Sequence, residues 1–511
     1  MSRFKNINEL KAGSIITYIN LIISTIIPLL YTPIMLRMLG KAEYGLYGIA
    51  NSVIGYLTLL NFGLGSAVNR YVIKFKVEDD KDKMQKMIGL FITIYSILAC
   101  AVIIGGFAMT GGAGIFFGNS LSQYEIDKLK ILMIIMSIST AVSFPTSVFS
   151  AVIVSYEKYI FRKIMDSLIT VITPILNLCV LYMGMASVGM AMVSLAIQIL
   201  YAVVMCFYCL KKLYVKPDFK ELPFYMLKEI GTFSAFVFLS TIIDMLYWAT
   251  DKVLIGSMIG TTAVAVYNIG GTFVSMLQNM SSAISGVFGT RVNSMVFKNQ
   301  SMSEISDLLV RVGRLQFIIV SLILSGYITF GKVFIQFWAG SDYIESYYIG
   351  LMTMIPLAVP LIQNIAYTTI VAMNKHRFRA IVYAVIAVIN VTATWLCIPR
   401  FGIVGAAACT AVAFVLGNGI IMNLYYSRIG LDIIRFWKNI IKMSIVPVGM
   451  CIVSYFIFKK IILINSLLMM LILAGVYTLI FIVLMWFISM NTYEKELFKS
   501  LIFKIVRIKN K

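Results

Sequence analysis

GTFSAFVFLSTIIDMLYWATDKVLIGSM, residues 231–258, is the stretch that decides the fold of this chain. It is long and apolar enough to cross a bilayer as a helix, yet it contains Asp244, Asp251 and Lys252. Each ionisable group at the centre of a membrane helix costs roughly 2.5–3.5 kcal/mol. Because the two acids are seven residues apart, a continuous helix places them on one stripe, which must face protein or a water-filled cavity. Asp244 and Asp251 are therefore candidates for ion coupling, and the alternative is a buried Asp251–Lys252 pair that only fixes helix packing.

The composition is that of a polytopic membrane protein. Of the 511 residues, 60% are hydrophobic and 13% are charged, and the mean hydropathy is +0.92. The first apolar run, residues 13–39, is too long for the core of a signal peptide, so we expect a retained span. All seven cysteines lie in apolar runs, and the one histidine, His376, lies in a basic loop. We therefore expect neither a disulfide framework, nor a metal site, nor catalytic residues.

Apolar runs predict fourteen membrane spans, and the basic residues predict their orientation. With the N-terminus inside, most of the 43 Lys and Arg residues fall in cytoplasmic segments and few in the outer connections. Both termini are therefore expected in the cytoplasm, and the net charge of +21 needs no nucleic acid as a partner. The predicted spans are 13–38, 43–68, 87–109, 128–154, 164–184, 187–210, 230–256, 262–288, 314–337, 347–372, 380–398, 402–426, 440–458 and 463–488.

Two capping boxes predict where helices begin. Ser122 with Glu125 starts the fourth span, and Ser301 with Glu304 starts a helix before the ninth. Residues 305–312 carry one apolar stripe. We expect that segment to lie along the inner membrane interface before the ninth span begins.

The chain contains an internal repeat. MLGKAEYGLYGIA (38–50) aligns with MIGTTAVAVYNIG (258–270), and the segment after Asn177 recurs after Asn390. Both pairs set the first six spans against spans seven to twelve. Since six is even, the halves have the same orientation and enclose a cleft, with substrate near the midplane.

The repeat predicts the domain organisation. We expect a six-helix bundle over residues 1–210, a cytoplasmic linker over 211–229 and a second six-helix bundle over 230–426. Residues 427–511 then form two additional transmembrane helices and a basic cytoplasmic tail.

Four elements of the sequence resemble one family of bacterial transporters. They are LR-x-LG-x-x-EYG-x-Y (36–47), NFGLGSA (61–67), ATDKVLIGSMIG (249–260) and IPRFGIVGAAACT (398–410). Together they are similar to the polysaccharide-transport proteins, the O-antigen or oligosaccharide-lipid flippases. These belong to the multidrug/oligosaccharidyl-lipid/polysaccharide exporter superfamily. The resemblance covers essentially the whole chain.

The resemblance implies a fold and an activity. The fold is an all-α integral membrane protein of about 14 transmembrane helices, with two six-helix bundles related by pseudo-two-fold symmetry plus two C-terminal helices. The activity is MATE-like alternating access in the bacterial cytoplasmic membrane. It would move an undecaprenyl-pyrophosphate-linked oligosaccharide to the outer leaflet for cell-surface polysaccharide biosynthesis. The lipid bilayer, a polysaccharide polymerase and a chain-length regulator are the further partners it implies.

Arginines near the span ends are candidates for binding a pyrophosphate. Arg37, Arg70, Arg291 and Arg314 lie there, and the first three carry our substrate-binding prediction. As fork-shaped donors they suit a pyrophosphate better than lysine does. The alternative is that they anchor their spans at the interface.

Three further polar residues complete the predicted substrate site. Asn61 and Asn69 could bind sugar hydroxyls, or they could bond neighbouring helices. Lys252 is the only base inside the seventh span.

The leading hypothesis is therefore a flippase for lipid-linked oligosaccharide that needs no cofactor and is coupled to protons or sodium. No phosphate-cradling loop is found in the sequence, so ATP is not expected as the energy source. A cation-coupled drug or metabolite exporter of the same superfamily is the first alternative, because it would use Asp244 or Asp251 to bind a cation. A membrane enzyme is the second, and it is disfavoured because every outer connection is short.

Overall fold

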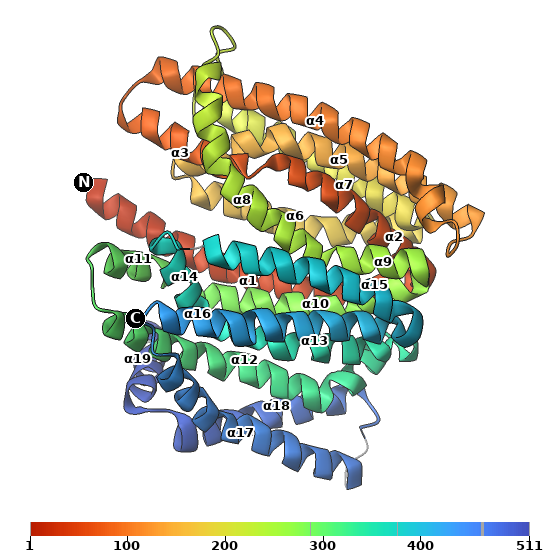
Figure 1. Cartoon of the computed structure of the whole chain (residues 1–511), viewed down its shortest axis with the longest axis vertical. Helices are drawn as coiled ribbons and strands as arrows, with labels where there is room; N and C mark the ends of the chain where they lie inside the picture. Colours follow the sequence, from red (N-terminus) through yellow and green to blue (C-terminus); the bar gives the residue numbers. More distant parts are fainter. Residues whose placement is uncertain (1, 287, 376, 461–463, 510–511) are drawn as a thin grey trace. The chain divides into compact units, whose positions relative to one another are not determined.

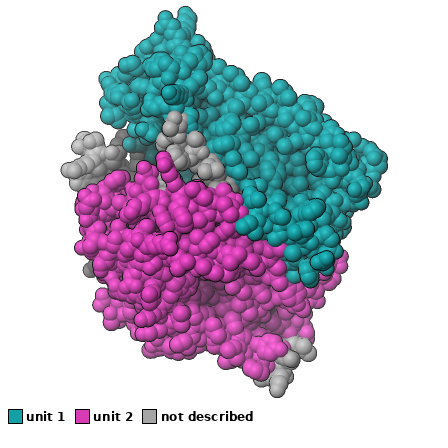
Figure 2. Space-filling model, viewed as in Figure 1, with its two compact units in different colours: residues 1–268, 387–406 teal, residues 269–386, 407–511 magenta. Residues whose placement is uncertain are grey.

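The computed structural model is built from helices, and the described part of the chain contains no strand. The structure describes residues 2–286, 288–375, 377–460 and 464–509. Within these ranges it leaves out the side chains of residues 2–18, 232–233, 235–237, 239–240, 243–244, 247–248, 283–284, 459–460 and 501–509. Contacts divide the chain into two compact units, which Figure 2 draws in two colours. Unit 1 is Met1–Asn268 with Ala387–Ala406, and unit 2 is Ile269–Ile386 with Ala407–Lys511.

Unit 1 is a bundle of long helices (Figure 1). In chain order it contains α1 (Ser2–Leu39), α2 (Lys41–Gly55), α3 (Leu64–Val77), α4 (Lys81–Phe117), α5 (Gln123–Ser155), α6 (Tyr159–Tyr182), α7 (Ala186–Phe207), α8 (Leu227–Trp248), α9 (Thr250–Met258) and the start of α10 (Thr261–Ser285). α4 packs along α5, and α1 packs along α6. Aromatic side chains fill the core, where Tyr71, Phe91 and Tyr95 are fully buried and the ring of Tyr95 meets Phe144 edge-on at 5.9 Å.

Unit 2 is also a bundle of helices. It contains the rest of α10, then α11 (Gly289–Phe297), α12 (Met302–Trp338), α13 (Glu345–Ile362), α14 (Asn364–Ala372), α16 (Met422–Arg428), α17 (Ile433–Lys460), α18 (Leu467–Leu484) and α19 (Thr492–Lys509). α15 (Arg377–Phe414) contributes its two ends, and a π-helical turn, η5 (Val415–Ile421), follows it. α12 packs against α17 and α18 through a hydrophobic cluster that includes Phe330, Met443 and Phe481.

The outer surfaces are apolar, as expected where lipid replaces water. Large hydrophobic side chains such as Ile104, Phe107 and Ile115 are more than half exposed. Eleven helices among the described residues are long and apolar enough to cross a membrane. The predicted class, an all-α integral membrane protein, is confirmed.

The number of fourteen spans stays a prediction. One of the eleven stretches, Arg377–Arg428, contains two predicted spans, joined at Gly402, whose φ is 58°. The predicted spans 230–256 and 262–288 correspond to α8 with α9 and to α10, where several side chains lie outside the described residues.

The helix starts are where the capping boxes predict them, but one helix is longer than expected. Ser122 accepts a hydrogen bond from the Glu125 backbone N–H, and Ser301 accepts one from that of Glu304. The expectation of a separate interfacial helix after Ser301 is wrong, because α12 is continuous over 37 residues. No proline lies between its amphipathic start and its apolar part, and Gly313 between them keeps the helical conformation, so the helix propagates.

The repeat has a local structural counterpart. Gly40 precedes α2 with φ 82°, and Gly260 precedes α10 with φ 119°. Only glycine adopts such positive angles freely, so the two aligned glycines make the same kind of turn before a helix. Asn177 and Asn390 are also both buried. The division into bundles at residues 210 and 230 stays a prediction.

Candidate functional site

The second predicted span is interrupted near its middle. α2 ends at Gly55, a 3₁₀ segment η1 (Tyr56–Asn61) follows, and α3 begins at Leu64. Between them Phe62 and Gly63 have left-handed φ angles of 49° and 67°. Such a break at membrane depth is tolerated where the backbone is buried in protein or faces a water-filled cavity. The NFGLGSA element is therefore the site of an irregular backbone.

The seventh predicted span is interrupted as well, and the two interruptions meet inside unit 1. α8 ends at Trp248 and α9 begins at Thr250. The hydroxyls of Tyr56 and Thr250 lie 2.6 Å apart, and the rings of Phe62 and Phe238 are 4.6 Å apart. We call residues 56–63 and 249–251 the paired break. Our premise of one continuous helix through residue 251 is therefore wrong.

Asp251 lies at the paired break and is buried. It is 1% exposed, and the Tyr267 hydroxyl donates a hydrogen bond of 2.5 Å to its Oδ2. Its carboxylate also lies near Tyr56. Because Asp251 is buried and hydrogen-bonded, it is not exposed to lipid, as predicted. Lys252 is half-buried on the same helix.

The side chain of Asp244 lies outside the described residues. Its part in a charged stripe with Asp251, and the exposure of either acid to a central cleft, stay predictions.

The two predicted asparagines bond neighbouring helices. Asn61 Oδ1 accepts a hydrogen bond of 2.6 Å from the Tyr95 hydroxyl on α4. Asn69 Oδ1 accepts one of 2.8 Å from Ser155 Oγ at the end of α5. Both contacts agree with the helix-bonding alternative, and the sugar-binding role stays a prediction.

The three predicted arginines are exposed. Arg37 is in the last turn of α1, and Arg70 is on α3, with its guanidinium carbon 6.0 Å from the centre of the Tyr71 ring. Arg291 lines a cleft of about 390 Å³ in unit 2, together with Lys298 and Arg311. Glu304 and Asp307 also line this cleft, so its charge is mixed.

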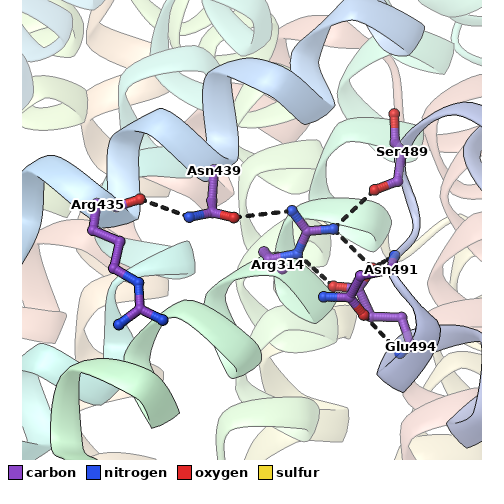
Figure 3. A network of polar contacts seen from close by, with 6 residues as sticks. All are labelled: Arg314, Arg435, Asn439, Ser489, Asn491 and Glu494. Carbon is purple, nitrogen blue, oxygen red and sulfur yellow. Dashed lines mark hydrogen bonds and ion pairs between the residues drawn. The ribbon is translucent and has the colours of Figure 1, made fainter. Parts of the chain in front are cut away.

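Arg314 is already neutralised by a partner within unit 2 (Figure 3). Its Nε and Nη2 donate hydrogen bonds of 2.5 and 2.9 Å to the two carboxylate oxygens of Glu494. Nη2 also donates to the Ser489 carbonyl, and Nη1 donates to Asn439 Oδ1. The arginine and the glutamate are 7% and 1% exposed. Arg314 thus joins α12 to α17 and α19 and is not available to a substrate.

The LR-x-LG-x-x-EYG-x-Y element has a packing role that the sequence did not reveal. Glu43 accepts hydrogen bonds of 2.5 Å from Lys128 Nζ on α5 and from Ser187 Oγ on α7. Three helices of unit 1 are joined by this one carboxylate.

Sequence reasoning also missed Tyr56, Thr250 and Tyr267. Tyr267 belongs to the repeat, where it aligns with Tyr47, so the repeat was a usable signal. Tyr56 and Thr250 are 194 residues apart in the sequence. No local pattern at either residue predicts a contact over that separation.

Comparison with known sequences identifies the family. A family model described as polysaccharide biosynthesis protein matches residues 10–290, which is more than half of the chain. The chain belongs to this polysaccharide biosynthesis family. A Shigella flexneri protein provisionally named an O-antigen transporter is 22% identical over 415 residues, covering 80% of this chain and 95% of that protein. The membrane protein EpsK of Bacillus subtilis, which is uncharacterised, is 23% identical over 429 residues, covering 80% of this chain and 81% of its own.

Solved structures of other proteins have a similar fold. The lipid II flippase MurJ in an inward closed conformation matches with a TM-score of 0.74 and 16% identity, over 91% of this chain and 98% of that one. An inward-facing multidrug resistance MATE transporter of the MOP superfamily matches with a TM-score of 0.68 and 12% identity, over 83% and 99%. The fold is that of the MurJ and MATE transporters.

Proposed function

We propose that this polysaccharide biosynthesis protein translocates a polyprenyl-pyrophosphate-linked oligosaccharide repeat unit across the bacterial cytoplasmic membrane by alternating access. The family match over residues 10–290 carries the proposal. The similarity to an O-antigen transporter and the MurJ-like fold support it. Both termini would be cytoplasmic, and a polysaccharide polymerase and a chain-length regulator would act on the product.

The paired break supports a conformational mechanism. Membrane helices that are interrupted near the midplane can bend there, because the turn lacks a continuous ladder of backbone hydrogen bonds. Tyr56 and Thr250 join the two interruptions, so a bend in one helix would be transmitted to the other. Alternating access would follow if the two states differ in their affinity for the lipid-linked sugar.

Arg70 and Arg291 would contact the pyrophosphate as it enters from the inner leaflet. Both are exposed on segments that the Lys and Arg distribution assigns to the cytoplasm. Replacing either by lysine keeps the charge but removes the bidentate fork, so translocation should fall at unchanged protein level. Normal export by both alanine variants would leave these residues as topology anchors only.

Translocation in reconstituted vesicles tests the function directly. A fluorescent undecaprenyl-pyrophosphate-linked oligosaccharide is placed in both leaflets, and an enzyme added outside reports how much becomes accessible. We expect the protein to raise the accessible fraction above that of protein-free vesicles. If the accessible fraction is the same with and without the protein when the oligosaccharide is a repeat unit of the host's own polysaccharide, the proposal is rejected.

A cation-coupled exporter of drugs or metabolites is the second candidate, and the buried Asp251 favours it. Such an exporter would bind an organic cation without a lipid carrier. If the same vesicles take up an organic cation along an imposed gradient and do not translocate oligosaccharide, the exporter function is supported instead.

A further inference from the structure

A guanidinium that contacts two tyrosine rings lies in unit 2. The guanidinium carbon of Arg379 is 4.0 Å from the centre of the Tyr367 ring and 4.4 Å from that of Tyr383. Tyr367 is on α14, and Arg379 and Tyr383 are in the first two turns of α15. Rings at these distances stack on the guanidinium, and Tyr383 is also within hydrogen-bonding reach of it.

One aromatic wall of this cradle, Tyr383, and the residue next to Arg379 in sequence, Phe378, are held in place. The Tyr383 hydroxyl donates a hydrogen bond to Asn418 Oδ1, in the π-helical turn η5. The Phe378 ring stacks on that of Tyr425, with centres 4.3 Å apart, and the Tyr425 hydroxyl donates to the Lys375 carbonyl at 3.0 Å. These contacts restrict the surroundings of Arg379 before any ligand arrives, which lowers the entropy cost of binding.

Arg379 has no acid to balance its charge in the described part of the chain. The ion pairs there involve other residues, and the charged or polar groups that bear on Arg379 are Tyr367, Tyr383 and Tyr426. The contrast with Arg314, which is saturated by Glu494, is clear. Stacking on rings stabilises a cation but leaves most of its five N–H donors without an acceptor.

Its position in the helix adds to this imbalance. Arg379 lies in the first turn of α15, which contains no acid. The positive end of a helix dipole disfavours a cation and favours an anion. An anion in front of Arg379 would satisfy both the guanidinium and the helix.

We propose that the Arg379 cradle binds the phosphate of a lipid headgroup at the side of the membrane that the basic residues assign to the cytoplasm. A planar guanidinium offers two parallel donors to two phosphate oxygens, and Tyr367, which is 38% exposed, leaves the cradle open at one side. The pyrophosphate of the polyprenyl carrier and the phosphate of an anionic phospholipid share this chemistry. Taking the carrier as the ligand rests on the proposed function.

Binding to the purified full-length protein in nanodiscs tests the inference. In one arm the probe is undecaprenyl pyrophosphate in phosphatidylcholine discs, and in the other it is phosphatidylglycerol titrated into the same discs. We expect Arg379→Gln to weaken binding by about tenfold or more in at least one arm, because a charge-assisted bidentate contact is lost. Arg379→Lys should be intermediate, since it keeps the charge and loses the fork.

The matched control is Arg435→Gln. It removes the same charge from unit 2, but Arg435 already pairs with Asp307 at 2.6 Å, so binding should be unchanged. Tyr367→Leu keeps the Arg379 cation and removes one aromatic wall, so it should also weaken binding. If Arg379→Gln does not fold, the affinity of Tyr367→Leu tests the inference in its place.

The two arms identify the source of the phosphate. A loss with undecaprenyl pyrophosphate assigns the site to the carrier, and a loss with phosphatidylglycerol alone assigns it to a membrane lipid. Parental affinity of folded Arg379→Gln in both arms overturns the inference. If the parent protein translocates oligosaccharide and Arg379→Gln binds both lipids with parental affinity, this inference is rejected and the proposed function is not. If the parent protein binds a lipid through Arg379 but translocates no oligosaccharide, the proposed function is rejected and this inference is not.

Discussion

Asp251 and Glu494, two carboxylates that are buried in the described part of the chain, have different partners. Asp251 accepts a hydrogen bond from a neutral tyrosine hydroxyl, which can also accept one. A protonated Asp251 can therefore keep this contact. Glu494 faces the arginine of a buried ion pair, so loss of its charge would leave Arg314 uncompensated. Glu494 is thus suited to holding helices together, and the coupling role of Asp251 stays a prediction.

Asp251→Asn should strongly reduce coupling without unfolding the protein. Asparagine has the volume of a protonated aspartate and still reaches Tyr267. We expect translocation driven by an imposed pH or sodium gradient to fall by about tenfold or more, since the group that exchanges a cation is lost. Vesicles that contain equal amounts of folded protein provide the measurement.

Asp127→Asn is the control for this variant. It removes an exposed carboxylate that contacts Gln123 and Lys130 at the start of α5, and should leave the gradient response intact. A parental gradient response in Asp251→Asn would mean that Asp251 only fixes packing.

Glu494→Gln should destabilise the protein by about 3–5 kcal/mol, because it leaves a buried arginine without its counter-charge. Unfolding in detergent measures the effect. Asp307→Asn removes the partner of Arg435, where the two side chains are 39% and 50% exposed, and should cost only about 0–1 kcal/mol. Arg314→Met combined with Glu494→Leu should recover most of the loss. Equal unfolding midpoints for Glu494→Gln and Asp307→Asn would refute the structural role of this pair.

At the scale of elements, close approach between α2 and the start of α10 depends on glycine. An ideal Cβ on Gly45 would lie 1.8 Å from the backbone oxygen of Thr261. A backbone atom cannot rotate away as the end of a side chain can. The LR-x-LG-x-x-EYG-x-Y element therefore brings two membrane helices together, in addition to the contacts of Glu43.

Gly45→Ala should consequently separate α2 from α10 and cost about 1–3 kcal/mol, as overpacking in a core does. The thermal unfolding midpoint and the yield of monodisperse protein measure this. Gly111→Ala is the matched control on α4, where nothing lies within 4 Å of the added Cβ. It should be neutral or slightly stabilising. If the two variants unfold at the same temperature, the close approach of α2 to α10 does not contribute to the stability of the protein.

At the scale of the whole molecule, two loops that the basic residues assign to the cytoplasm lie together in unit 1. The backbone N–H of Asp218 donates to the Gln85 carbonyl at 3.1 Å. Lys86 pairs with Glu221 at 3.4 Å. The linker 211–229 and the start of α4 are thus on one side of the bundle, as the Lys and Arg counts require.

Cysteine labelling tests which side this is. In a variant without its native cysteines, Lys220→Cys should react in whole cells only with a membrane-permeant reagent. Asn119→Cys, exposed in the predicted outer connection, should react with an impermeant one as well. Labelling of Lys220→Cys by the impermeant reagent would reverse the predicted topology.

Local patterns in the sequence determined the class of the protein and most of its helices. Apolar runs, the distribution of Lys and Arg, and the capping boxes act within one or two turns of chain, so they can be read without knowing what packs against them. The repeat also identified Gly40 and Gly260 as equivalent turns. Asp251 was identified because a charge in an apolar run is costly wherever the helix lies.

The tertiary structure decided how that charge and the others are compensated. Arg314 finds Glu494 from 180 residues away, and Tyr56 finds Thr250 from 194. The break at Ala249 has no proline or glycine beside it, so no local signal marks it. Pairing between distant side chains depends on which helices pack together, and that depends on the summed burial of all their faces. Local sequence therefore set the elements, while packing between distant segments decided that Arg314 is paired with a buried glutamate.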